Sequence, residues 1–191
     1  MAQEALQVAG FAGSLRKGSV NRLLLHAAMR LAPGGIAVTE LDISAVPLFN
    51  EDEETAGPPE AAVRFKEAVA AADGLLIVTP EYNSGTTAVT KNLLDWASRR
   101  SRPGNVLTGK PVAIMSMSGG PNGIGMYARA QVRQTILFPG AVPMPRWDVG
   151  APNGAANFDE AGNLINEALA ERITQAMARF ADWIRLVAPW E

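Results

Sequence analysis

The feature that most constrains this fold is a nearly pure apolar run at residues 74–79, standing directly before Pro80. It contains two leucines, an isoleucine and a valine, without the alternation of a strand that has one face in water. Strands of this kind are covered on both faces, as in a parallel sheet flanked by helices. The run therefore predicts a central parallel strand.

Strand-like and helix-like segments alternate along the rest of the chain, and neither an internal repeat nor a linker interrupts them. This alternation predicts a doubly wound α/β sheet with right-handed crossovers. Five strands favour a flavodoxin-like three-layer sandwich of order 2-1-3-4-5 over a six-stranded dinucleotide fold. We expect residues 1–191 to form a single domain. The other four strands are predicted at residues 6–12, 36–42, 111–116 and 141–144.

Two features of the composition narrow the chemistry. The chain has no cysteine, which excludes disulfides, thiolate metal sites and cysteine nucleophiles. Its single histidine, His26, makes a histidine-rich metal site or a Ser–His–Asp triad a poor hypothesis. We therefore expect no metal site, and any redox chemistry must use a bound cofactor.

Charge and hydropathy indicate the class of partner. The formal net charge of −2 does not favour a nucleic-acid or membrane partner. The N-terminal segment lacks the pattern of a signal peptide, and no apolar run reaches the roughly 18 residues that span a bilayer. We expect a cytoplasmic protein that acts on small molecules.

The loop after the first strand carries groups suited to an anion. Ser14 and Ser19 have hydroxyl donors, Arg16 has charge-assisted donors, and Asn21 has an amide in the first turn of the next helix. Free backbone amides at a helix N-terminus also favour phosphate. The alternative is an ordinary capped helix, with Ser19 as its cap and Arg16 in water.

Two more loops should reach the same edge of the sheet, because the carboxyl ends of parallel strands lie together. Residues 80–86 offer the aromatic face of Tyr82 and the amide of Asn83, and Gly119 and Gly120 let backbone approach a flat ligand. Each loop alone also fits an ordinary turn or a flexible connector. Together the three loops favour a planar, phosphorylated cofactor.

Several segments resemble the NADPH-dependent FMN reductase family, most closely its chromate and quinone reductase branch. They are residues 13–21, residues 80–83 with 91–96, and residues 158–164. The resemblance implies that FMN is bound through its phosphate, its ribityl chain and its ring. The implied FMN-binding residues are Ser14, Leu15, Arg16, Ser19, Val20 and Asn21 near the phosphate, Pro80, Glu81, Tyr82 and Asn83 around ribityl and ring, and Ser116, Gly119 and Gly120 beside the ring.

The resemblance also implies the activity. A hydride passes from NAD(P)H to FMN, and electrons then pass by ping-pong kinetics to a quinone, chromate, ferric or flavin acceptor. No side chain is expected to act as a catalytic acid or base, and Glu81 is expected to cap backbone. Residues 91–92 and 95–96 are expected to be scaffold. The resemblance also implies a homodimer or homotetramer. Tyr127 or Trp147 could serve its interface.

The sequence departs from the family pattern at three places. Thr87 stands where a proline is usual, and Thr90 stands where a leucine is common. The arginine expected after the glycine loop falls at Tyr127 without a gap, or at Arg129 with a small shift. We expect these changes to affect the choice of substrate and the subunit contacts more than FMN binding.

Two other functions and one charged cluster stay open. A flavodoxin-like electron carrier without NAD(P)H turnover is the main alternative. A dehydrogenase with dinucleotide in the first loop is another, since Asp42 ends the second strand where such folds keep a ribose-binding acid. The cluster Arg99, Arg100 and Arg102 either attracts anionic substrates or is a solvated helix end.

Overall fold

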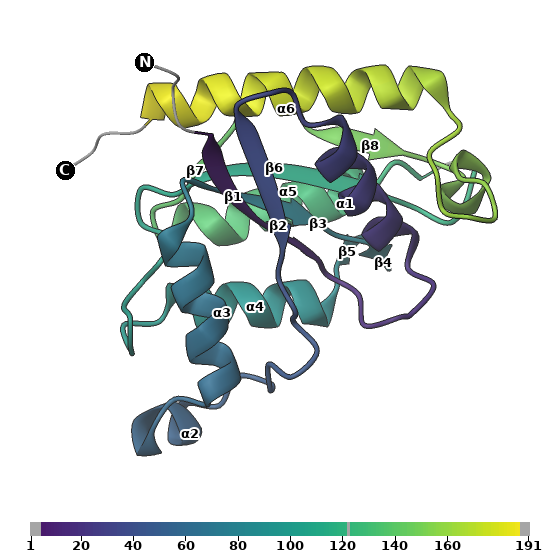
Figure 1. Ribbon diagram of the computed structural model, residues 1–191. Coiled ribbons are helices and arrows are strands. Elements are labelled where there is room, and N and C mark those ends of the chain that lie inside the picture. The colour runs from purple at the N-terminus through teal and green to yellow at the C-terminus, as the bar shows by residue number, and fades with distance from the viewer. Residues whose placement is uncertain (1–4, 122, 188–191) are drawn as a thin grey trace.

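The computed structural model describes residues 5–121 and 123–187 and shows a central sheet between two layers of helices (Figure 1). The strands pair in parallel in the order β2-β1-β3-β6-β7. Counted along the sheet, this is the predicted 2-1-3-4-5 order, and it confirms the α/β fold class. The strands are β1 Leu6–Ala12, β2 Ile36–Glu40, β3 Gly74–Val78, β6 Pro111–Met117 and β7 Val142–Pro143.

The helices divide between the two faces of the sheet. Helices α1 (Val20–Leu31) and α6 (Glu167–Val187) cover one face, and their apolar side chains share one core cluster with the sheet. Helices α3 (Glu60–Ala71), α4 (Ala88–Ser98) and α5 (Met126–Leu137) enclose a second cluster on the other face. The three layers of the predicted sandwich are therefore present.

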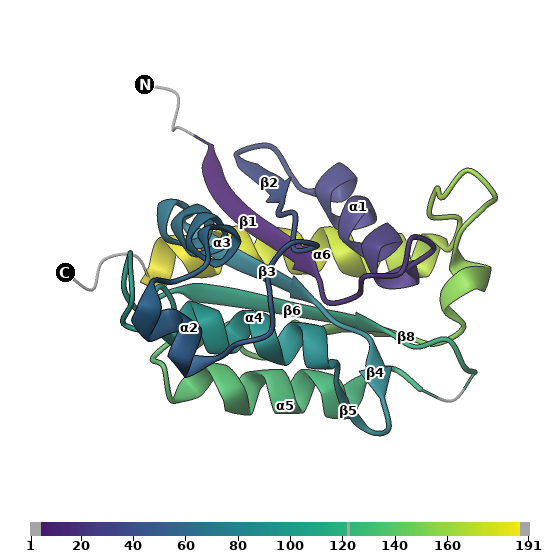
Figure 2. The same cartoon turned by 90° about the horizontal axis from the view of Figure 1, so that it is seen from below.

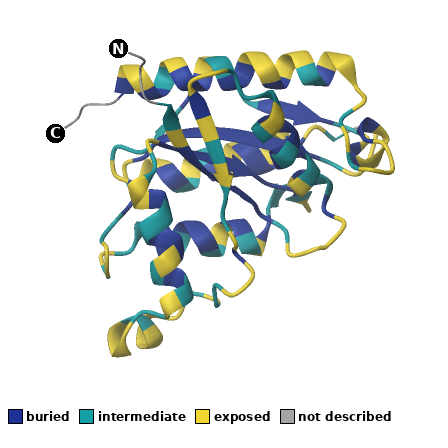
Figure 3. Ribbon diagram, viewed as in Figure 1, coloured by how far each residue is buried: buried dark blue, intermediate teal, exposed yellow. Residues whose placement is uncertain are grey.

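The central strand β3 behaves as its sequence predicts. Every residue from Gly74 to Val78 is buried, and β3 lies between β1 and β6 (Figure 3). Its neighbour β6 is also buried along its whole length. Because both faces of this pair lack water, the loops that leave their carboxyl ends start from a rigid base.

The second loop contains a hairpin that the sequence analysis did not predict. Strands β4 (Glu81–Tyr82) and β5 (Gly85–Thr86) pair antiparallel outside the main sheet. Between them, Asn83 and Ser84 have φ angles of 50° and 58°. Two positive φ angles are the signature of a tight hairpin turn of type I′.

The edge beyond β6 also differs from the prediction. The predicted strand at residues 141–144 is reduced to β7, which pairs only with the start of β6. A further strand, β8 (Val149–Ala151), pairs with Met115–Met117 at the other end of β6. Three residues are too few for a pattern of alternation, so β8 left no recognisable signal in the sequence.

Two short helical segments complete the described chain. The acidic residues 51–54 form the first turn of helix α2 (Glu51–Ala56), which has no buried residue. A 3-10 turn, η1 (Gly154–Asn157), precedes α6.

Candidate functional site

The three loops at the carboxyl ends of β1, β3 and β6 lie together at one edge of the molecule (Figure 2). Specific hydrogen bonds join them. The Thr87 hydroxyl at the start of α4 donates to the Gly13 carbonyl oxygen at 2.7 Å. The Ala128 amide of α5 donates to the Glu81 carboxylate of the hairpin at 2.9 Å. The predicted convergence of the loops is confirmed.

The first loop presents unpaired backbone donors. The amides of Leu15, Lys17 and Gly18 donate to no group within the described residues. The Ser14 hydroxyl oxygen accepts the Arg16 amide at 3.3 Å, which leaves its own proton available. The Arg16 side chain is exposed and makes no ion pair with the described part of the chain. These groups have the chemistry of an anion site at a helix N-terminus.

Ser19 and Asn21 have structural roles beside this loop. Ser19 is the N-cap of α1, since its hydroxyl oxygen accepts the Arg22 amide at 3.3 Å. The buried Asn21 amide donates to the Met117 carbonyl oxygen at 2.8 Å and accepts the Met117 amide at 2.9 Å. These bonds tie α1 to the end of β6 and use one of the two N–H groups of the Asn21 side-chain amide.

A network of threonine hydroxyls supports the start of the first loop. The Thr90 hydroxyl lies 2.9 Å from that of Thr79 and 2.9 Å from that of Thr87, and Thr79 also contacts Thr86 at 2.8 Å. Thr79, Thr87 and Thr90 are all buried. The two departures from the family pattern, Thr87 and Thr90, are therefore partners in one network that ends on Gly13.

In the second loop, Glu81 and Tyr82 are used differently. Glu81 caps the first turn of α5 through Ala128, as expected of a backbone-capping group. Tyr82 is exposed on the hairpin and makes no side-chain hydrogen bond within the described residues. Pro80 is buried, whereas Asn83 is exposed in the hairpin turn.

In the third loop, Gly119 and Gly120 are exposed, whereas Ser116, at the end of β6, is buried. A Cβ added at Gly119 or Gly120 would meet nothing within 4 Å, so the backbone there borders open space. Ser116 instead is fully buried, and its Oγ has no hydrogen-bond partner within the described residues. A Cβ on Gly125 would overlap that Oγ. The Ser116 side chain therefore lies against Gly125 at the start of α5, below the level of the exposed glycines.

The two candidates for the family's arginine position occupy different environments. Arg129 is buried, donates to the Ile124 carbonyl oxygen and lies 3.8 Å from Asp148. Burial lowers the pKa of Arg129, although Asp148 opposes this shift. Tyr127 is exposed on the outer face of α5. Arg129 therefore holds the third loop from inside, and Tyr127 is free to meet another molecule.

The basic cluster lies at the wrong end of α4 to serve the rim. Helix α4 begins at the hairpin and runs to the opposite edge of the sheet, near α2 (Figure 2). There Arg99 pairs with Glu54 at 2.7 Å and with Glu51 at 3.1 Å, and Arg102 pairs with Glu67 at 2.8 Å. The interpretation as a solvated, helix-ending cluster is the one that the structure supports.

The other segment that carries the family resemblance is scaffold, as expected. The Asn92 side chain donates to the Pro47 carbonyl oxygen at 2.8 Å and accepts the Phe49 amide at 2.7 Å. The Trp96 indole donates to the same Pro47 oxygen at 2.9 Å. These bonds fasten the loop after β2 onto α4.

A cavity of about 360 Å³ opens between the first loop and the end of β2. Ser14 and Arg16, which the sequence predicted at an anion site, line this cavity. Arg22 and Glu40, which no local pattern indicated, also line it. Arg22 lies on α1 and Glu40 on β2, so only the parallel pairing of β1 with β2 brings them together. Asp42, which the sequence marked as a strand-end acid, lines the same cavity.

Comparison with known proteins identifies the family to which this chain belongs. Residues 6–156 match the NADPH-dependent FMN reductase family. The chain belongs to this family. It is 41% identical over 182 residues to an NAD(P)H-dependent FMN reductase of Pseudomonas aeruginosa, covering 94% of this chain and 96% of that protein.

Two further relatives extend the comparison. A 2-hydroxy-1,4-benzoquinone reductase of a Burkholderia species is 38% identical over 181 residues, which cover 95% of this chain and 97% of the relative. The flavoenzyme NAD(P)H:(acceptor) oxidoreductase of Paracoccus denitrificans superposes with a TM-score of 0.83 at 32% identity, covering 95% of this chain and 98% of that structure. The flavodoxin-like fold is thereby confirmed.

Membership of the FMN reductase family makes the chain an oxidoreductase that binds FMN and uses NAD(P)H as cosubstrate. The residues present fit such a cofactor. The first loop offers unpaired amides, a serine hydroxyl and Arg16 for a phosphate, and the glycines of the third loop leave open space for a flat ring. No helix within the described residues is long and apolar enough to cross a membrane.

Proposed function

We propose that this FMN reductase transfers electrons from NAD(P)H to quinones. The observation that carries the proposal is the combination of an open rim with the similarity to quinone reductases over nearly the whole chain. The rim offers backbone amides, glycines and Tyr82, which suit a flat apolar acceptor. Anaerobic reduction of the purified yellow protein by NADPH, followed by reoxidation with a benzoquinone, tests it directly.

The proposed FMN-binding residues follow the geometry of the three loops. Ser14 and Arg16, with the backbone of Leu15 and the α1 cap Ser19, are proposed to hold the phosphate, and Val20 lies in the first helical turn beside them. Tyr82 and Asn83 are proposed to line the ribityl chain and ring, with Gly119 and Gly120 opposite. Pro80 and Glu81 hold the hairpin in place. Asn21 and Ser116 stay in the proposed set, although the Asn21 side chain also ties α1 to β6 and the Ser116 hydroxyl is buried.

One open pocket is proposed to serve both substrates in turn. Bound FMN supplies the hydride-accepting ring, and the protein positions each substrate against it. Glu81, the one carboxylate of the hairpin, already accepts the Ala128 amide, so no proton donor is assigned to the rim. Steady-state rates at several quinone concentrations should give parallel double-reciprocal lines. Intersecting lines would contradict the ping-pong proposal.

The range of acceptors is also proposed to be broad. Chromate, ferric chelates and free flavin can be compared with quinone in the same assay. A protein that binds FMN but oxidises no NAD(P)H with any acceptor would instead be an electron carrier. The net charge of −2 does not provide the strongly acidic docking face of such a carrier.

We also propose that residues 1–191 form one FMN-binding domain that acts in the cytoplasm as a homodimer or homotetramer. The outer face of α5 supports a subunit contact, since Tyr127, Leu137 and Phe138 are exposed there and Phe138 is 98% exposed. Apolar and aromatic residues of this kind are enriched at subunit interfaces. Sedimentation that gives a 20.2 kDa particle at micromolar concentration would contradict the oligomer.

A further inference from the structure

Arg22 lines the cavity between the first loop and β2, and Glu40 on β2 binds its guanidinium. The Arg22 Nε donates to Glu40 Oε1 at 2.7 Å, and His26 Nε2 lies 2.7 Å from the other oxygen, Glu40 Oε2. Arg22 and His26 are four residues apart on α1 and so face β2 together. Both oxygens of Glu40 are therefore occupied, and the Arg22 guanidinium is fixed through a single nitrogen.

The outer edge of this guanidinium is free. Neither Nη of Arg22 has a hydrogen-bond partner within the described residues, and its side chain is 52% exposed. A guanidinium with two parallel free N–H groups matches the oxygens of a phosphate. Because Glu40 has already fixed the rotamer, little conformational entropy is lost when a ligand binds. The arrangement is typical of a preorganised phosphate ligand.

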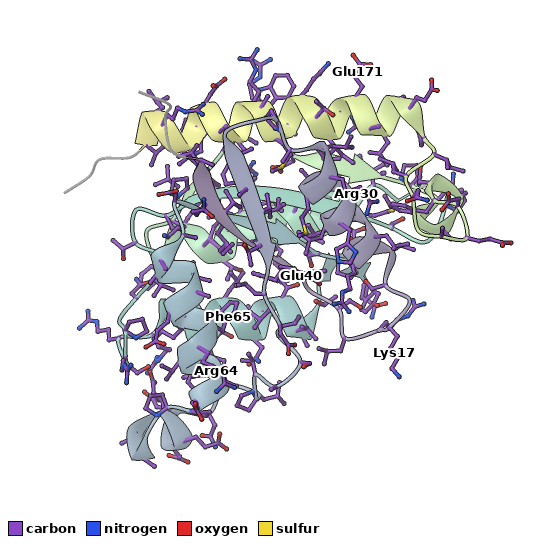
Figure 4. The ribbon with its side chains drawn as sticks, in the orientation of Figure 1. Lys17, Arg30, Glu40, Arg64, Phe65 and Glu171 are labelled. Carbon is purple, nitrogen blue, oxygen red and sulfur yellow. The ribbon has the colours of Figure 1, made fainter. Side chains whose placement is uncertain are left out.

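The rest of the lining is suited to a phosphorylated ribose. Arg16 and Lys17 also line the cavity, so its lining contains three cationic residues and the two carboxylates of Glu40 and Asp42. Figure 4 shows Glu40 on β2 and Lys17 on the neighbouring loop, with the Lys17 side chain extending outward. Asp42 Oδ1 accepts the Ser44 amide at 2.9 Å, and its second oxygen accepts nothing within the described residues.

The charge state of Glu40 supports this reading. Burial raises the pKa of Glu40, but hydrogen bonds with His26 and Arg22 outweigh burial and hold that pKa below its usual value. Glu40 therefore stays ionised and keeps its grip on Arg22 at neutral pH. The FMN phosphate is proposed to use the first loop, through its free amides, Ser14 and Arg16, whereas Arg22 on α1 and Asp42 after β2 line the rest of the same cavity.

We propose that this cavity binds the adenosine end of NADPH, with Arg22 on the 2′-phosphate and Asp42 on a ribose hydroxyl, and so makes the enzyme prefer NADPH to NADH. This inference rests on the proposed use of NAD(P)H at the rim and adds the site that distinguishes the two nucleotides. Glu40 is a positioning residue, since it acts only through Arg22. A quinone has no phosphate and does not need this cavity.

The kinetic test compares Arg22→Leu with wild type, both loaded with FMN. The ratio of kcat/KM for NADPH to that for NADH should fall about ten-fold or more, through KM rather than kcat. The KM for quinone should not change. Arg30→Leu, an exposed arginine at the other end of α1, is the matched control and should leave the ratio unchanged. Glu40→Gln should give a smaller fall in the same ratio.

A binding measurement separates this inference from the proposed function. Titration of FMN-loaded protein with 2′,5′-ADP and with 5′-AMP should show tighter binding of 2′,5′-ADP, and Arg22→Leu should abolish the difference. No preference in wild type, or a preference retained in Arg22→Leu, would overturn the proposal. Loss of FMN from Arg22→Leu to the same extent as from Arg16→Ala would also overturn it. Failure of NAD(P)H turnover alone would count against the proposed function only.

Discussion

The two ends of the sheet use polar groups in opposite ways. At the end away from the rim, charged groups are paired: Lys66 donates to the Arg99 and Ser101 carbonyl oxygens at 2.9 and 2.6 Å, and Arg99 pairs with two glutamates. At the rim, the amides of Leu15, Lys17 and Gly18 donate to nothing within the described residues. The paired charges at the far end stabilise the fold, whereas the unpaired amides at the rim are available to a ligand.

This difference explains why the arginine cluster is a poor guide to function. Arg99 stacks over the Phe49 ring at 4.9 Å as well as pairing with Glu51 and Glu54. Its groups are satisfied internally, and they lie one helix length from the hairpin. Arg16, a single arginine on a loop, has no partner among the described residues and stands where the ligand is expected. Substitutions at the two ends should therefore separate stability from binding.

The largest effect on stability is expected for Lys66→Met. Lys66 is 0% exposed, and methionine keeps most of its volume but leaves two partly buried carbonyl oxygens without their donor. We expect the free energy of unfolding to fall by about 2–4 kcal/mol in urea denaturation. FMN affinity should stay unchanged. Lys91→Met, which removes an exposed pair with Asp95, is the control and should cost less than about 0.5 kcal/mol.

Arg16→Ala should have the opposite profile. Removal of a charge-assisted phosphate ligand worth roughly 1.5–3 kcal/mol should weaken FMN binding by about ten-fold or more. The stability of the apoprotein should not change, because Arg16 is exposed and unpaired among the described residues. Fluorescence titration with FMN and with riboflavin measures both. Equal affinity of wild type for the two flavins would refute the phosphate site, and Arg64→Ala on α3 is the control.

Thr90→Val tests whether the buried threonine network positions the first loop for FMN binding. The change keeps the shape of the side chain but removes the hydroxyl that joins Thr79 to Thr87 behind Gly13. We expect a loss of about 1 kcal/mol in stability and a few-fold loss in FMN affinity, because the loop is less firmly placed. Thr135→Val, at a partly exposed position on α5 outside this network, should change neither. A stable Thr90→Val protein with unaltered FMN affinity would show that the network does not position the loop.

The smallest expected effect is a loss of stability at acid pH, to which Glu54 contributes. Burial raises the pKa of Glu54, but hydrogen bonding and the charge of Arg99 outweigh it and leave that pKa lowered, as at Glu40. A lowered pKa in the folded state stabilises the protein above about pH 4.5 and loses that stabilisation as pH falls through the folded value. Thermal unfolding should show a falling Tm below pH 4.5. In Glu54→Gln this fall should be shallower, and an unchanged slope would argue against the contribution of Glu54.

Much of the fold follows from local sequence. The apolar run at residues 74–79 identified the central strand, and the polar loops after β1, β3 and β6 identified the rim. Ser14 and Arg16 could be proposed as phosphate ligands because one short loop contains them. The hairpin at Asn83 and Ser84 was missed because neither residue is glycine, the usual residue at a positive φ.

The surroundings of two proposed site residues could not be predicted from local sequence. Asn21 bonds Met117, a residue 96 positions away, and no local pattern reveals such a partner. Ser116 lies on a buried strand between Met115 and Met117, so its side chain points to the opposite face from theirs. The direction of each side chain depends on which helix covers which face. The same dependence on tertiary pairing concealed the contact between Arg22 and Glu40.

The measurement that tests the whole account most directly is anaerobic double-mixing stopped flow on the purified protein, followed at the flavin absorbance band. The account predicts a yellow protein whose absorbance bleaches with NADPH in the absence of any acceptor and returns when a benzoquinone is added in the second mix. A colourless protein, or a flavin band that NADPH and NADH both leave unchanged, would contradict it.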